Sequence, residues 1–154
     1  GGRVFSLIHL SPYDGWTAFS AKIKDMIERV KKISVVDKYT RAGIRYINGF
    51  DFNILEKVNL SISLSKDHLI GLDSTIRMSV PSGEFTSTLQ VINNAEVKKA
   101  DASIKGSLID IDTYIDNPKD DMVKIVEQGH LEEKKLFFTL LKNEFVQKEL
   151  NPEY

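Results

Sequence analysis

The sequence has 154 residues, with 21 lysines and arginines against 22 aspartates and glutamates, and its net charge is −1 when the histidines are neutral. This length predicts one domain with a real core, and the balanced charge disfavours a nucleic-acid binder, which usually has a basic excess. The lack of cysteine excludes disulfides, thiolate zinc sites, iron–sulfur clusters and cysteine nucleophiles. No apolar run approaches the ~18 residues of a membrane span, so we expect a cytoplasmic protein.

The first segment, Arg3 to Leu10, alternates like a β-strand but has apolar residues on both faces, which is typical of a strand covered on both sides. A helix is predicted to follow, with Ser11 as its cap and Pro12 at its first position. A stripe at helical spacing predicts the face that packs on the core. It consists of Trp16, Phe19, Ile23, Met26, Ile27 and Val30.

The next segment, Ser34 to Asn48, is predicted to be one extended strand. The residues that share one face of it are Tyr39, Arg41, Gly43, Arg45 and Ile47. Gly49 to Lys57 is expected to be a loop or a short helical piece. The alternation from Leu60 to Leu64 fits a short strand.

A hairpin is predicted next, with a strand from His68 to Val80 and a turn at Pro81-Ser82-Gly83. The inner face of its second strand carries Phe85, Leu89 and Val91. Asn93 to Asp101 is predicted to be a polar loop, and Ala102 to Ile115 another long strand. The apolar set of that last strand changes phase, which indicates a β-bulge near Leu108.

The C-terminal region is predicted to be helical, and Asn117 to Asp120 repeats the cap pattern of the first helix. Gly129 leaves open whether there is one helix or two, because an interior glycine costs only ~1 kcal/mol. We interpret the charged run Glu132 to Lys135 as a solvated helix face. Asn151-Pro152 is expected to end the structure.

These elements follow the order β-α-β(n)-α without an internal repeat or a linker. They predict a single α+β domain over residues 1–154, with a curved, mostly antiparallel sheet of about four to six strands. The N-terminal helix and the long C-terminal helix are expected to pack on one face of that sheet. By analogy alone, this order is like that of helix-grip and TATA-binding-protein-like folds.

Four groups of residues carry a family resemblance. They are Tyr13 to Phe19 (Y-x-G-W-x-x-F), Arg41 to Asn48 (R-x-G-x-R-Y-I-N), Leu108 to Tyr114 (ending D-x-D-x-Y), and His130 with Leu136-Phe137-Phe138. Together they resemble an uncharacterised prokaryotic family with a sporadic distribution. The resemblance spans this chain but only the C-terminal portion of the family's usual length. It therefore implies the C-terminal part of a longer protein, and it brings no established activity.

The best ligand-site candidates are Arg41 and Arg45, which lie four residues apart on one strand face with Gly43 between them. A guanidinium fork suits a carboxylate or a phosphate, and Tyr39 on the same face offers a ring for stacking. The alternative is that both arginines pair with carboxylates of neighbouring strands or of the missing part of the protein. Structural ion pairs are the commoner case.

A second candidate is the pair Asp110 and Asp112, which also share a strand face. Two carboxylates at this spacing are able to hold a magnesium ion, to pair with Arg41 and Arg45, or to lie on the surface. We expect no bound metal or other cofactor. The histidines His9, His68 and His130 have no metal-ligand spacing, and the chain has neither a phosphate-binding glycine loop nor a serine nucleophile motif.

The sequence therefore favours a non-catalytic binding or interaction module. Its expected partner is the missing N-terminal half or another protein, which predicts an exposed apolar patch. The alternative is an enzyme or sensor for a small anionic ligand, with Arg41 and Arg45 as the clamp and Asp110 or Asp112 as base or metal ligand. A lysine-rich first helix leaves nucleic-acid binding as a third and weaker hypothesis.

Overall fold

The structure is a computed structural model that describes residues 4–10, 12–33, 36–61, 63–64, 67–68, 73–99, 102–119 and 121–150. The helices are α1 (Trp16–Ile33), η1 (Ile54–Glu56), α2 (Met122–Leu140), α3 (Asn143–Phe145) and η2 (Val146–Leu150). The strands are β1 (Arg41–Phe50), β2 (Ser63–Leu64), β3 (Asp67–His68), β4 (Ser74–Ser82), β5 (Phe85–Lys99) and β6 (Ala102–Asp116). None of the described helices is long and apolar enough to cross a membrane.

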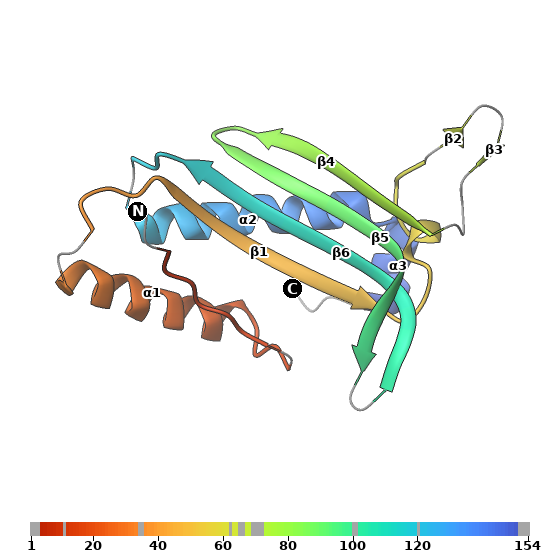
Figure 1. The fold of residues 1–154 in the computed structure, drawn as a ribbon, viewed down its shortest axis with the longest axis horizontal. Coiled ribbons are helices and arrows are strands. Elements are labelled where there is room, and N and C mark those ends of the chain that lie inside the picture. The colour runs from red at the N-terminus through yellow and green to blue at the C-terminus, as the bar shows by residue number, and fades with distance from the viewer. Residues whose placement is uncertain are drawn as a thin grey trace.

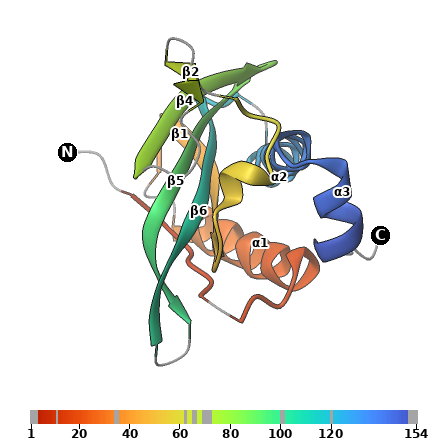
Figure 2. The same cartoon turned by 90° about the vertical axis from the view of Figure 1, so that its right-hand side faces the viewer.

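The fold is α+β, with a four-stranded antiparallel sheet in the order β1-β6-β5-β4 and a separate two-stranded pair of β2 and β3. Helix α2 lies across one face of the sheet and leaves the other face open (Figure 1). Helix α1 lies on the same side of the sheet as α2 (Figure 2) and meets the rest of the fold chiefly through α2. The antiparallel α+β architecture is therefore confirmed.

The core follows from strict alternation along the strands. Residues on the α2 side are apolar and buried, among them Leu89, Val91, Ile109 and Ile111 at 0–2% exposure. Their neighbours in sequence face the open side and are mostly polar. This is the pattern of an antiparallel sheet with one packed and one solvated face.

The first predicted strand is wrong. Residues 4–10 form no strand, and their side chains are largely exposed, for example Val4 at 90% and Ile8 at 75%. Helix α1 begins at Trp16 rather than at Pro12, and the Gly15 carbonyl accepts the Phe19 N–H at 3.1 Å. Gly15 has a φ of 88°, which glycine adopts without steric cost. The predicted cap, Ser11, lies outside the described residues.

Two further strand boundaries differ. β1 begins at Arg41, so residues 36–40 are not part of it, and Ser34 and Val35 lie outside the described residues. β4 runs through Ser82, which moves the hairpin turn to Gly83 and Glu84. Gly83 has a φ of 58°. Of the predicted strand His68 to Val80, residues 69–72 lie outside the described part.

The predicted polar loop from Asn93 to Asp101 is also wrong, because β5 continues to Lys99. The register shifts between Asn93 and Ala95, so the bulge lies in β5 and not near Leu108 in β6. The inserted residue, Asn94, has a φ of 58°. Beyond this bulge β5 and β6 continue as a two-stranded arm past the ends of β1 and β4 (Figure 1). A bulge of this kind increases the local twist.

Helix α2 is continuous through Gly129, which answers the question that the sequence left open. Its N-cap is Asp121, whose side chain accepts a hydrogen bond from the Val123 N–H at 2.9 Å. The predicted start at Asn117 is therefore too early. Asn151 and Pro152 lie outside the described residues. Gly129 is tolerated inside α2 because its Cα, which has no side chain, packs against Phe85 and Ile44.

Gly106→Ala should lower the free energy of unfolding by roughly 2–3 kcal/mol. A Cβ at this position would clash with the Phe50 carbonyl oxygen, and neither backbone can move without disturbing the sheet. Gly129→Ala is the control, because its Cβ would meet Phe85 and Ile44 at 3.4 and 3.5 Å. That variant should match the wild type or gain up to ~1 kcal/mol from helix propensity. Urea denaturation measures both, and equal stabilities of the two variants would contradict the close approach.

Candidate functional site

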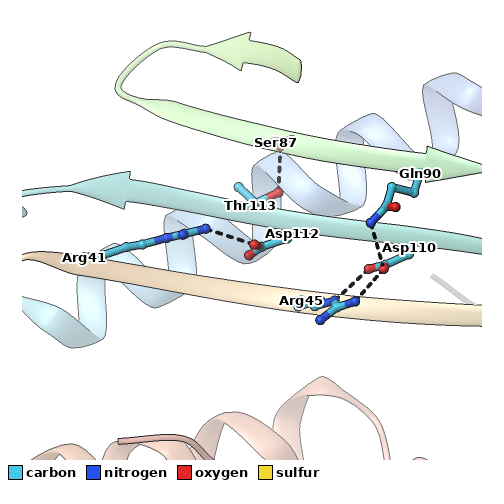
Figure 3. Close-up of polar contacts among 7 residues, drawn as sticks. All are labelled: Arg41, Arg45, Ser87, Gln90, Asp110, Asp112 and Thr113. Carbon is cyan, nitrogen blue, oxygen red and sulfur yellow. Dashed lines mark hydrogen bonds and ion pairs between the residues drawn. The ribbon is translucent and has the colours of Figure 1, made fainter. Parts of the chain in front are cut away.

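The open face of β1 and β6 brings the four predicted charged residues together. The register places Arg45 opposite Asp112 and Ile47 opposite Asp110. Arg45 reaches diagonally to Asp110, with Nε–Oδ1 at 2.8 Å and Nη2–Oδ2 at 2.6 Å. Arg41 donates from Nη2 to Asp112 Oδ2 at 2.9 Å (Figure 3). The four side chains thus form two neighbouring ion pairs.

The two pairs differ in burial. The Asp110 side chain is only 10% exposed and also accepts a hydrogen bond from Gln90 Nε2 at 3.4 Å. Asp112 is 35% exposed, and the guanidinium of its partner Arg41 also lies 3.7 Å from the ring centroid of Tyr114. The hydrogen bond and charge of Asp110 raise the pKa of Arg45 above its ordinary value. Bidentate pairing of this kind is the stronger geometry.

This geometry is the ion-pair alternative that the sequence allowed, and a ligand role for the four residues stays a prediction. Tyr39 lies ahead of β1, so the alternation of the strand does not place it with Arg41 and Arg45. No group of three or more potential metal ligands occurs among the described residues. On the α2 side of the sheet, Ser87 of β5 and Thr113 of β6 share a buried hydrogen bond of 2.7 Å (Figure 3).

A second cluster, which sequence reasoning missed as a unit, joins α1, β1 and α2. The Trp16 indole stacks on the His130 imidazole, with ring centroids 3.8 Å apart at an angle of 15°. The Tyr46 ring lies 5.7 Å from the same imidazole, and its hydroxyl is 3.0 Å from that of Tyr13. These residues belong to three of the four motifs that carry the family resemblance. The motifs therefore meet in space around His130.

Glu133 belongs to this cluster and corrects the interpretation of the charged run as a solvated face. It is only 4% exposed, and burial raises the pKa of its carboxyl group to about 7. Its Oε2 lies 4.0 Å from His130 Nδ1, a buried nitrogen with no hydrogen-bond partner among the described residues. Burial lowers the pKa of His130 and raises that of Tyr46. Desolvation thus disfavours the charged forms of all three groups.

A signal for Glu133 was present in the sequence. Ile125, Gly129 and Glu133 are spaced by four residues, and Leu140 follows seven residues later, so all lie on one helix face. This spacing predicts a buried glutamate. Because Glu133 lies among other charged residues, the composition of residues 132–135 indicated an exposed face instead.

The third feature is the free edge of β1. Bonded and non-bonded pairs alternate in an antiparallel ladder, and the Asn117 N–H donates to the Thr40 carbonyl at 2.8 Å. The even-numbered residues of β1 therefore bond to β6. The odd-numbered residues direct their backbone N–H and C=O to the free edge. They are Arg41, Gly43, Arg45, Ile47 and Gly49.

The opposite edge of the sheet is different. Each strand bonds to its two neighbours through alternate residues. When this alternation is followed from β1 through β6 and β5, the odd-numbered residues of β4 direct their backbone N–H and C=O to the outer edge. One of them is Pro81, which has no N–H to offer. Proline is a common means of protecting a sheet edge against further pairing. β1 has no proline, so only the β4 edge is protected in this way.

An open hollow lies beside the β1 edge. It is lined by the whole of β1, by residues 4–10 and by an apolar stripe of α1. The stripe consists of Ile23, Met26, Ile27 and Val30. The segment 4–10 runs alongside β1 in the same direction (Figure 1). Its Leu10 is 77% exposed, and Ile47 on β1 is 59% exposed. Exposed apolar side chains therefore line this hollow, and a docking patch for a partner stays a prediction.

The comparisons with known proteins give this chain no relative. No family model, curated protein or solved structure matches it. The geometry of the three features above therefore carries the functional argument.

Asp110→Asn should cost about 1–2 kcal/mol of stability, because Arg45 loses a charged, part-buried partner. Asp112→Asn is the matched control on the same strand face and should change stability by less than ~0.5 kcal/mol, since its ion pair is more exposed. Chemical denaturation at low and at moderate salt measures both. A larger loss for Asp112→Asn would contradict the difference in burial.

Glu133→Gln should become more stable relative to the wild type as the pH rises. The folded pKa of Glu133 lies near 7, above its ordinary value of 4.5, so folding binds a proton between these values and wild-type stability falls with rising pH. The relative gain should approach about 3 kcal/mol above pH 7. The lowered pKa of His130 acts in the opposite direction, which makes the comparison of variants better than the wild-type profile alone.

Denaturation curves at pH 5 to 8 measure this difference. Glu127→Gln is the control, because Glu127 lies on the same helix but is 46% exposed and pairs with Lys24 at 2.7 Å. It should follow the wild type. A Glu133→Gln profile parallel to the wild type would contradict the buried, protonated carboxyl group.

Proposed function

We propose that this protein is a non-catalytic interaction module that binds a partner protein at the hollow beside β1. The observation that carries the proposal is the free edge of β1, a ten-residue strand whose outward backbone groups open onto an apolar hollow. Exposed sheet edges are templates for pairing with another chain. A large apolar surface on a folded domain is typical of an interaction site.

The partner in this proposal is the N-terminal part of a longer protein or a separate protein. The motif resemblance to an uncharacterised prokaryotic family supports the first of these, since that family is longer than this chain. The proposal includes a cytoplasmic location and neither a membrane nor a nucleic-acid partner, on the grounds of composition and charge. It also keeps the helix-grip likeness, which rests on α2 lying across one face of the sheet.

A second candidate is a sensor or enzyme for a small anionic ligand at Arg41 and Arg45. The observation in its favour is that these side chains are 50% and 55% exposed on the open face. Each arginine is already paired with a carboxylate, so an anion would have to displace or share that partner. This requirement makes the interaction module the better proposal.

The module is tested with a double variant, Ile8→Asp with Leu10→Asp, which adds charge to the wall of the hollow at side chains that are 75% and 77% exposed. Proteins retained by the wild-type bait and lost by the variant should be purified and should bind the wild type directly. The fold should persist, because neither side chain is in the core. If no purified protein distinguishes the two baits, the module proposal fails.

The second candidate is tested by a thermal-shift screen of inorganic phosphate, nucleotides, phosphorylated sugars and magnesium, repeated on Arg45→Ala. The module predicts no stabilising ligand in this panel. A stabilising ligand that is lost in Arg45→Ala would favour the anion sensor.

A further inference from the structure

We propose that the partner binds as an extended β-strand that is added to the free edge of β1. This inference rests on the proposed function and names the form in which the partner is recognised. At every second residue of β1, from Arg41 to Gly49, the backbone N–H and C=O have no backbone partner among the described residues, and the residues between them pair with β6. Strand addition to such an edge takes its affinity from main-chain hydrogen bonds and its specificity from alternate side chains.

The β1 edge is the one suited to this role. Pro81 removes a donor from the opposite edge of the sheet, at β4. The β1 edge keeps all five of its odd-numbered N–H groups. Two of these residues are Gly43 and Gly49, so no side chain hinders close approach there. The ten residues of β1 span ~33 Å, enough for a strand of ordinary length.

The hollow also determines the chemistry of the added strand. On the α2 side of the sheet, its side chains would meet the half-buried part of the lining of the hollow, which includes Met26 of α1 and Met122 and Val126 of α2. On the other side, they would continue the open face that carries the Arg41 and Arg45 ion pairs. The occupant is therefore a strand that alternates apolar and polar residues. We assign it to a partner protein.

Residues 4–10 fit this position less well, whether from the same molecule or from a second copy. Their alternation places apolar residues on both faces, so one apolar set would lie on the polar, solvated face of the sheet. In the structure they line the same hollow as β1 and form no strand with it. They would therefore flank the added strand rather than replace it.

The test uses the peptide TVKVTVKV, acetylated and amidated, and measures binding by calorimetry. Its valines form the apolar face and its threonines and lysines the polar face. In antiparallel pairing the amides of the polar residues point to β1, and in parallel pairing those of the valines do. Two control peptides carry N-methyl groups, one on every polar residue and the other on every valine.

The expected result is that the parent peptide binds and that one N-methylated peptide loses binding while the other keeps it. The peptide that fails gives the direction of the added strand. Equal binding of both N-methylated peptides would overturn the inference, because binding would then not depend on one edge of the peptide.

The protein side is tested by Ile47→Pro, which removes one outward N–H of β1 without touching a bond to β6. It should weaken binding of the parent peptide about tenfold, through the lost hydrogen bond and the altered strand geometry. Ser79→Pro is the matched control, because Ser79 is also exposed and odd-numbered but lies at the β4 edge. Circular dichroism verifies the fold of both. If Ser79→Pro weakens binding as much as Ile47→Pro, the assignment to β1 is wrong.

Light scattering and a peptide of residues 4–10 distinguish the other occupants. A dimer that is lost in Ile47→Pro, or tighter binding of the 4–10 peptide than of TVKVTVKV, would assign the edge to a second copy and overturn the partner strand. If no peptide binds but a purified partner still distinguishes the wild type from the Ile8 and Leu10 double variant, the strand inference fails and the module stands. If both experiments fail, both proposals fall.

Discussion

Strands β1 and β6 pair in a single register that determines where the side chains and the backbone groups of β1 point. Even-numbered residues of β1 bond to β6 and point their side chains toward α2, as buried Ala42 and Ile44 do. Odd-numbered residues point their backbone groups to the free edge and their side chains to the open face. One register thus sets the core, the two ion pairs and the edge together. A slip of the register by one residue would turn the core side chains to the open face, and the open-face side chains and the free backbone groups would change places with their neighbours.

Helix α1 contacts the rest of the fold chiefly through α2, and it lines the hollow together with β1. The Trp16 stack on His130 connects the first turn of α1 to α2, and the Tyr13–Tyr46 hydrogen bond connects the preceding segment to β1. Near the other end of α1, the Lys31 ammonium pairs with Asp121 at 2.7 Å. The half-buried His130 and the buried Glu133 beside it are polar groups at the α2 end of this stack.

The sequence predicted the features that depend on local alternation, and missed those that depend on tertiary contacts. The shared face of Arg41 and Arg45 and that of Asp110 and Asp112 were both correct, because a strand has a fixed period of two. Residues 4–10 have the same alternation but form no strand, since no described neighbour pairs with them. Asn93 to Lys99 is polar in composition, yet it pairs with β6 beyond a bulge that no pattern in β5 shows.

Amide hydrogen exchange measured by NMR shows whether the edge of β1 is free in the unbound protein. If it is free, exchange will be slow at Ala42, Ile44, Tyr46 and Asn48, whose N–H groups bond to β6, and fast at the residues between them. An alternation of this kind along one strand has no other source in this fold. Equal protection at Gly43, Arg45 and Ile47 would show that another segment already occupies the edge, so that β1 is not available to a partner strand.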